Sequence, residues 1–313
     1  MADIDVLAVG ELNPDLILTG IAADQPRLGI EQEFATPLLT LGSSTAIACV
    51  LMRRLGAVTA MAAWVGDDDN GQFCRTALER EGVDTALVRT DPALPTGITV
   101  CLPYPADRML LTARGTMALD PADGISDAML ARVRHVHVGS FFLQTALRPA
   151  VAGLFARARA AGATTSLDTG WDPAELWLDD DLRAALAHTS FFFPNELEFE
   201  KLTGTTDVER GVATLLALGT GAVVLKRGAE GAVHGDRDGQ VFDDGFPATA
   251  VDTTGAGDSF NAGYLTAMLS GAAVADRLAF GTACGALTVA AVGGTGGVTD
   301  EEQVRRFIAA HPR

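Results

Sequence analysis

The chain has 313 residues, of which 48% are apolar, and its formal net charge is −17. With 23 Lys and Arg against 40 Asp and Glu, it lacks the dense basic surface that follows a phosphate backbone, so we expect no nucleic-acid partner. The first residues, MADIDVLAVGELNPDLI, carry acids where a signal peptide needs bases, and the longest apolar runs are too short to span a membrane. We therefore expect a cytoplasmic protein without membrane contact.

The expected elements alternate along the chain. Short apolar runs at 5–10, 58–66, 134–140, 164–170, 189–195 and 222–228 predict buried strands, and helical spacing predicts helices at 44–57, 70–83, 148–163 and 208–221. Strands that alternate with helices favour right-handed βαβ units and a mostly parallel sheet. No linker divides the chain, so residues 1–313 are predicted to form one domain.

Two segments, 13–40 and 93–118, interrupt this alternation. Both are strand-like, but no helix separates their strands, and Pro, Gly and Thr punctuate them. They predict an antiparallel accessory sheet, as a flap or an edge of the molecule. An exposed strand edge invites pairing with a second copy, so we expect this sheet to permit a homodimer.

The stretch DTTGAGDSFNAGY, residues 252–264, carries the clearest chemical signal. Helical spacing after Asp258 places Gly255, Ala256 and Gly257 at a helix N-terminus, where uncovered backbone amides can bind an anion. A tight turn with Asp258 as a simple helix cap is the alternative interpretation. Two glycines beside an acid favour a phosphate site in which Asp258 accepts a proton from an attacking hydroxyl, which is the arrangement of phosphoryl transfer.

Other nucleotide signatures are absent from the sequence. There is no GxxxxGK[ST] motif and no GxGxxG after the first strand, which argues against a Walker loop and against a nicotinamide oxidoreductase. The glycine-rich stretch at 293–297 is predicted to be a turn between C-terminal helices.

Less specific features have simple structural interpretations. The four cysteines (Cys49, Cys74, Cys101, Cys284) form no CxxC pair and are expected to be buried free thiols. His135 and His137 share one face of a predicted strand without a third metal ligand, which favours packing or an ordinary hydrogen bond. The acids at 67–69 are expected to cap a helix.

The 252–264 stretch resembles the C-terminal signature of the ribokinase-like (PfkB) sugar and nucleoside kinases. GELNPDL, WVGDDDNGQF, PTGITV, FPNELEFEKLTG and LKRGAEGA resemble other family segments in the same order, so the likeness covers nearly the whole chain. The resemblance implies a three-layer αβα sandwich with a small β-sheet lid, formed here by about 13–40 and 93–118. It also implies transfer of the ATP γ-phosphate to a hydroxyl of a sugar or polyol, with Asp258 as the base and residues 255–257 as the anion hole.

Asn195 and Glu198 are three positions apart and would share a face of a helix's first turn. Spacing alone is also typical of an Asn cap with a first-turn Glu. The resemblance implies that these two residues order Mg²⁺ and the phosphates, and oxygen donors of this kind suit a hydrated Mg²⁺.

The expected acceptor site begins after the first strand, where polar side chains commonly meet a ligand. Asp15 follows Asn13 and Pro14, and a plain turn is the alternative. The resemblance implies that Asp15 bonds substrate hydroxyls, and it adds to the site the residues Asn13, Gly42, Ser43 and Asp168. Four positions depart from the family pattern. Leu41 replaces a glycine and Asp172 replaces an arginine. Ile47 and Gly170 stand where asparagines are expected. These departures leave the acceptor undefined.

The resemblance also implies nucleotide contacts and ion contacts. Lys226, Gly228, Gly231 and Thr282 match positions near ATP, although Lys226 by itself could be a strand-end charge facing solvent. Asp252 and Thr254 match positions that bind a monovalent cation such as K⁺ in several members. A nucleoside kinase of the same fold and a ligand-binding protein without catalysis remain the alternatives.

Overall fold

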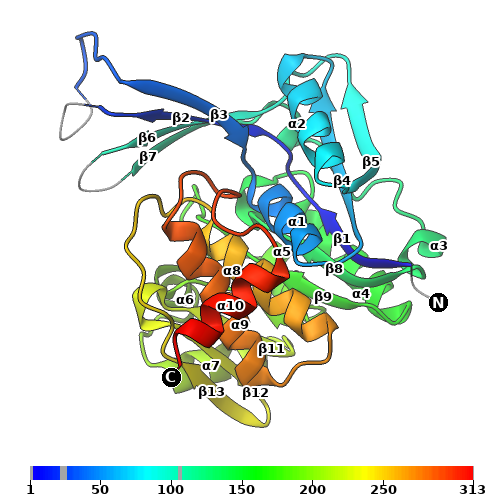
Figure 1. Cartoon of the computed structure of the whole chain (residues 1–313). Helices are drawn as coiled ribbons and strands as arrows, with labels where there is room; N and C mark the ends of the chain where they lie inside the picture. The colour runs from blue at the N-terminus through cyan, green and yellow to red at the C-terminus, as the bar shows by residue number, and fades with distance from the viewer. Residues whose placement is uncertain (1–2, 22–26, 105–107, 313) are drawn as a thin grey trace.

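The computed structural model describes residues 3–21, 27–104 and 108–312. In this part of the chain, nine strands form one sheet in the order β13-β12-β11-β10-β9-β8-β1-β4-β5 (Figure 1). All neighbours from β11 to β5 pair in parallel, and β12 and β13 add an antiparallel edge, which confirms the predicted mostly parallel sheet. The strands are β1 (Ile4–Val9), β4 (Thr59–Gly66), β5 (Asp84–Asp91), β8 (Val133–Val138), β9 (Thr164–Leu167), β10 (Phe191–Phe192), β11 (Ala222–Lys226), β12 (Ala232–Asp236) and β13 (Gly239–Asp243).

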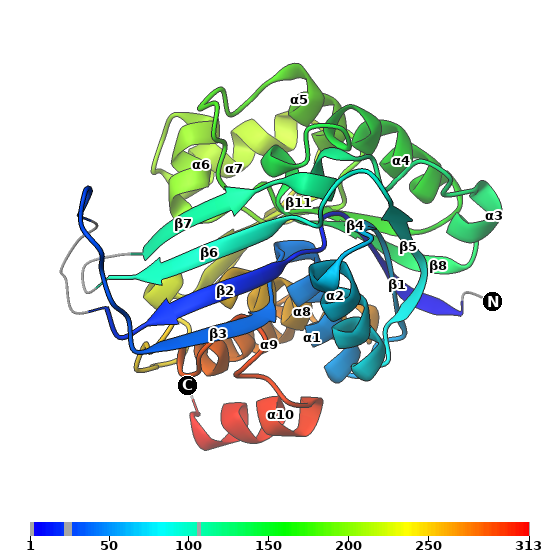
Figure 2. The same cartoon turned by 90° about the horizontal axis from the view of Figure 1, so that it is seen from above.

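Helices cover both faces of this sheet (Figure 2). One face carries α1 (Ser44–Arg54), α2 (Asp69–Arg80), α8 (Ala256–Leu269), α9 (Val274–Val289) and α10 (Glu301–Ala310). The other carries α3 (Asp127–Leu130), α4 (Arg148–Ala160), α5 (Asp180–Leu186), α6 (Glu196–Thr203) and α7 (Val208–Ala217). Short 3-10 turns lie at η1 (Gly115–Ala118), η2 (Phe141–Leu143) and η3 (Gly228–Glu230).

Separate apolar cores form on the two faces of the sheet. Phe141, Phe155 and Leu182 belong to the core on the α4 side, whereas Leu51 and Tyr264 belong to the core on the α8 side. The interior strand β1 is apolar and buried on both faces from Val6 to Val9, as expected for a parallel strand between two helix layers. The molecule is therefore a three-layer αβα sandwich.

A second sheet of four strands stands beyond one edge of the sandwich (Figure 1). It contains β2 (Pro14–Thr19), β3 (Thr36–Leu41), β6 (Ile98–Pro103) and β7 (Arg108–Ala113), in the order β3-β2-β6-β7. The predicted antiparallel pairing is confirmed for β2 with β3 and for β6 with β7, but it is wrong at the centre of the sheet, where β2 and β6 pair in parallel. The chain leaves the parallel strands β1 and β5 at the same edge, so β2 and β6 enter the second sheet in one direction. Residues 22–26 and 105–107 of the predicted segments lie outside the described residues.

Several local predictions are confirmed. Asp68 caps α2 by accepting a hydrogen bond from the Gly71 amide at 2.8 Å. The rings of His135 and His137 both bond the Ser166 hydroxyl at 2.7 Å, and the four cysteines are buried and free. The 293–297 stretch joins α9 to α10. Within the described ranges, none of the helices is long and apolar enough to span a membrane.

Candidate active site

Two cavities meet at the N-terminus of α8. The main cleft has a volume of about 740 Å³ and the side pocket about 380 Å³, and they share Lys226, Gly228, Thr253 and Gly257. The predicted residues that line the main cleft are Asn13, Asp15, Ser43, Asp168, Asn195, Glu198, Lys226, Gly228, Thr254, Gly255, Gly257 and Asp258. Those that line the side pocket are Lys226, Gly228, Gly231, Ala256, Gly257 and Thr282. Gly42 and Asp252 line neither cavity but support residues that do.

The start of α8 has the backbone of an anion site. Gly255 adopts a left-handed φ of +73°, and a Cβ there would lie 2.4 Å from the Cα of Gly294, so both conformation and space require glycine. The Ala256 amide makes a long contact of 3.4 Å with the Thr253 carbonyl. The first-turn amides of α8 thus lie between the two cavities, where the helix dipole favours negative charge.

Asp258 follows this turn and lines the main cleft. Its Oδ1 accepts a hydrogen bond from the hydroxyl of Ser44, the first residue of α1. This bond joins the N-termini of two helices at one carboxylate. The structure therefore gives Asp258 a partner that spacing in the sequence did not predict.

A buried ion pair lies beside the anion site. Lys226, at the end of β11, donates to Oδ2 of Asp168 at 2.5 Å, and the Asn261 amide donates to the same oxygen at 2.7 Å. Burial would raise the pKa of Asp168, but the Lys226 ammonium holds it below its usual value. A Cβ on Gly257 would lie 3.3 Å from Lys226 Nζ, so the ammonium reaches the start of α8. Lys226 is not a solvent-facing charge, since its side chain is only 13% exposed.

Asn195 and Glu198 form a capping box, which is one of the two interpretations that their spacing in the sequence permits. Asn195 Oδ1 accepts from the Glu198 amide, and Glu198 Oε2 accepts from the Asn195 amide, both at 2.9 Å. Burial, reinforced by the Asp168 carboxylate, raises the pKa of Glu198 to about 7.

Residues 195 and 198 also fit a metal site of a particular kind. Across residues 3–21, 27–104 and 108–312, no three His, Cys, Asp or Glu side chains gather closely enough to hold a metal directly. Two oxygen-bearing side chains at the cleft suit a Mg²⁺ ion that keeps its water and takes its other ligands from phosphate oxygens.

Polar side chains after β1 form one wall of the main cleft. The Glu11 carboxylate accepts from the Thr45 amide at 3.2 Å and from the Thr45 hydroxyl at 2.7 Å, while the Ser43 hydroxyl bonds the Glu11 carbonyl. A Cβ on Gly42 would lie 2.1 Å from Asp15 Oδ1, so glycine makes room for this carboxylate. Burial raises the pKa of Glu11 to about 7.

Asp252 holds the backbone around the expected cation site. Its two carboxylate oxygens accept from the amides of Thr254 and Gly293, each at 2.9 Å. Asp252 therefore fixes the 252–254 turn against the 293–297 stretch, and only Thr254 of the predicted pair faces the main cleft.

The side pocket is mainly apolar. Phe246, Phe260 and Val289 line it beside Thr282, whose hydroxyl lies 2.9 Å from the Asp243 carboxylate and 3.0 Å from the Leu278 carbonyl. An apolar pocket with few polar groups that opens onto an anion site suits the base of a nucleotide.

The residues at the site that the sequence analysis missed include Glu11, Ser44, Trp171 and Asn261. Glu11 carried a detectable signal, since it directly follows a buried strand. Asn261 lies three positions after Asp258 in the predicted helix, and its contact with Asp168 comes only from the fold.

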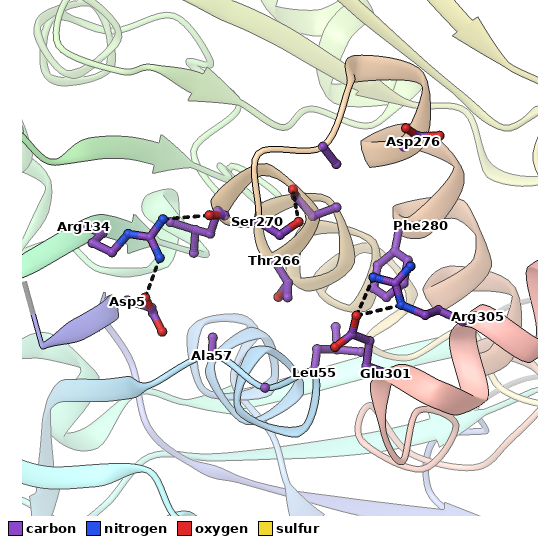
Figure 3. A pocket seen from close by; sticks show the side chains of 14 residues that line it. Asp5, Leu55, Ala57, Arg134, Thr266, Ser270, Asp276, Phe280, Glu301 and Arg305 are labelled. Carbon is purple, nitrogen blue, oxygen red and sulfur yellow. Dashed lines mark hydrogen bonds and ion pairs between the residues drawn. The ribbon is translucent and has the colours of Figure 1, made fainter.

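A third cavity, of about 290 Å³, lies at the opposite end of α8 (Figure 3). Four of its five charged side chains form two ion pairs, Asp5 with Arg134 at 2.7 Å and Glu301 with Arg305 at 2.5 Å, and Asp276 is the fifth. It brings together none of the residues predicted for the site.

An anion site with a neighbouring carboxylate, open to a nucleotide-sized pocket on one side and a polar cleft on the other, defines a phosphotransferase of the α/β class. The chain belongs to the pfkB family of carbohydrate kinases, whose family model matches residues 4–301. It is an ATP-dependent carbohydrate kinase with a ribokinase-like fold.

The names of the individual relatives state different phosphate acceptors. The chain is 31% identical to the ATP-dependent ribose-1-phosphate kinase of Halopiger xanaduensis, over 90% of this chain and 91% of that one. It is 30% identical to the 2-dehydro-3-deoxygluconokinase of Bacillus subtilis, over 86% of each chain. A structure from E. coli, described as a ribokinase II in complex with ATP and Mg²⁺, superposes with a TM-score of 0.86 at 25% identity, covering 98% of this chain and 100% of that one.

Proposed function

We propose that this kinase transfers the γ-phosphate of ATP to a hydroxyl of a sugar or related polyol, with Asp258 as the general base. The observation that carries the proposal is the junction of the two cavities at Asp258 and the first turn of α8. A donor in the side pocket and an acceptor in the main cleft would meet at that point.

The residues at this junction have distinct roles. The amides of residues 255–257 bind the transferred phosphoryl group and stabilise the charge that develops on it. Asp258 accepts the proton of the attacking hydroxyl, and the Lys226 ammonium adds positive charge beside the same amides. Ser44 orients the Asp258 carboxylate through its hydrogen bond.

Two further groups of residues bind the substrates. Gly228, Gly231 and Thr282, together with Lys226, hold ATP in the side pocket. The acceptor hydroxyls face Asn13, Asp15, Ser43 and Asp168, with Gly42 providing the space beside Asp15.

Metal ions complete the donor site in this proposal. Asn195 and Glu198 would hold Mg²⁺ through water and phosphate oxygens, and the ion would neutralise charge on the phosphates. Asp252 and Thr254 would place oxygens near a monovalent cation such as K⁺. Replacing K⁺ with a large organic cation should then lower the rate, and an unchanged rate would remove the cation from the proposal.

Two alternatives share this fold. A nucleoside kinase would use the same junction with a base in the main cleft, and a ligand-binding protein would bind ATP without turnover. The complete set of Asp258, the α8 amides and Lys226 favours catalysis over binding alone.

The test is ADP release from MgATP with pentoses, hexoses, sugar acids, polyols and nucleosides, using Asp258→Asn as the blank. We expect turnover with one class of sugar or polyol and none in the blank. Turnover with nucleosides alone would support the first alternative, and ATP binding without turnover on any acceptor would support the second.

A further inference from the structure

The main cleft is lined by residues of two different kinds. The polar wall is formed by side chains that follow β1 or begin α1, namely Glu11, Asn13, Asp15, Ser43 and Ser44. The remaining lining includes Leu110 of β7, Trp171 and Leu197, which are 50%, 47% and 49% exposed. Large apolar side chains exposed around one cleft mark a surface that meets another apolar group.

The two kinds of residue come from different places along the sheet edge. Glu11 follows β1, Trp171 follows β9 and Leu197 follows β10, in the strand order β10-β9-β8-β1. Neighbouring strands are about 4.8 Å apart, so the strand ends that carry the two groups are separated by roughly 10–14 Å. Asp168 also follows β9, so the polar lining reaches the strand that carries Trp171, and a cleft of about 740 Å³ has room for a sugar that bears a further group.

The loop that carries Trp171 is held rigidly. The buried Asp172 carboxylate accepts from the amides of Ala174, Leu176 and Trp177 at 2.9, 2.7 and 2.7 Å. Glu175 and Trp177 adopt φ values of +52° and +54°, which are strained for residues other than glycine. Strained loops of this kind persist where the surrounding structure fixes them, often at sites that bind ligands.

The indole of Trp171 is half-exposed and packs against a second tryptophan. Its ring lies edge-on to Trp177, with the centroids 5.0 Å apart and the planes at 87°. Trp177 in turn packs edge-on against Phe142 at 5.8 Å. The rest of the Trp171 ring is exposed at the main cleft, which gives a pre-oriented surface for stacking.

We propose that the acceptor is a sugar bearing an apolar aryl substituent, which packs on Trp171 while the sugar hydroxyls face the polar wall. This inference rests on the proposed function and names its substrate class. Leu110, Leu143 and Leu197, which also line the cleft, offer this substituent further apolar contacts.

The experiment compares matched acceptors that differ only in the substituent. The methyl and phenyl glycosides of ribose, glucose and galactose are titrated calorimetrically into the full chain with a non-hydrolysable ATP analogue, and KM and kcat are measured with MgATP. We expect at least one phenyl glycoside to bind about three- to tenfold more tightly than its methyl counterpart, the range set by one aromatic contact.

Variants locate the preference within the cleft. Trp171→Ala should remove the preference for phenyl by lowering the affinity for the phenyl glycoside more than the affinity for the methyl glycoside, and Trp171→Phe should retain most of the preference. Leu176→Ala is the matched control, since Leu176 lies in the same loop, is 71% exposed and does not line the cleft.

Equal affinity for phenyl and methyl glycosides would overturn the inference, and so would an equal loss for both in Trp171→Ala. These outcomes are separate from failure of the proposed function. A phenyl preference in calorimetry without turnover on any acceptor would contradict the proposed phosphoryl transfer but would support the inferred aryl-binding site.

Discussion

Lys226 and Asp168 illustrate how a single residue pair links stability to the site. Both side chains are largely buried, at 13% and 6% exposed, and each neutralises the other. Removing one partner leaves a buried charge without its counter-ion, which is costly even where the pair itself contributes little.

We therefore predict that Lys226→Met lowers the free energy of unfolding by about 3–5 kcal/mol. The double variant Lys226→Met/Asp168→Asn should recover part of this loss, measured by urea unfolding. Arg305→Met, which removes an exposed ion pair with Glu301, should cost less than about 1 kcal/mol. A cost for Lys226→Met as small as that of Arg305→Met would contradict the account of this pair.

Glu11 makes stability depend on pH. Its pKa is raised by burial from 4.5 to about 7, so the folded protein binds a proton at Glu11 that the unfolded chain releases between these values. The stability associated with this proton is present below pH 4.5 and is lost as the pH rises through 7.

Relative to Glu11→Gln, the wild type should lose up to about 3 kcal/mol of unfolding free energy between pH 4.5 and pH 8. Denaturant unfolding across this range measures the difference. Glu302→Gln, at a side chain that is 78% exposed, should give a curve parallel to the wild type. Parallel curves for Glu11→Gln would show that Glu11 titrates normally.

Asp68 connects two structural elements, because its carboxylate joins helix α2 to the second sheet. Besides capping α2, its carboxylate accepts from the Thr96 amide and from the Thr96 hydroxyl, both at 2.7 Å, just before β6. Asp300 is a matched control, since it caps α10 through the Gln303 amide at 2.7 Å.

Asp300→Ala should cost about 1 kcal/mol, the usual value of a cap. Asp68→Ala should cost about 2–3 kcal/mol, because it also leaves the Thr96 groups without an acceptor. It should also raise the KM for the acceptor, since β6 carries Thr99 and Cys101 of the main cleft. Equal costs for the two variants and an unchanged KM would contradict this role.

Elements with local signals could be predicted from the sequence, whereas long-range contacts could not. The left-handed glycine before α8 and the capping box at Asn195 are determined by residues that are neighbours in the sequence. The parallel pairing of β2 with β6 depends on where β1 and β5 end in the main sheet. Likewise, Lys226 and Asn261 meet Asp168 across 58 and 93 positions, and only the fold brings them together.

The whole molecule presents a β-sheet with exposed apolar edges. Leu38 and Leu39 of β3 are 40% and 41% exposed, and Leu111 of β7 is 49% exposed. Both strands lie at edges of the four-stranded sheet, where unpaired backbone groups favour association.

We predict a homodimer formed through this sheet. Light scattering on the full chain should give twice the chain mass of 32.5 kDa, and Leu39→Lys should shift the mass toward the monomer. A wild-type mass of 32.5 kDa would contradict dimerisation.

The most direct test of the account is the rate of phosphoryl transfer in Asp258→Asn, measured on the best acceptor, together with its affinity for MgATP. We predict that kcat falls by at least about 100-fold, the usual contribution of a general base, while the MgATP affinity stays within about threefold of the wild type. A variant that keeps a near-normal kcat would contradict the role of Asp258 and, with it, the mechanism proposed for this site.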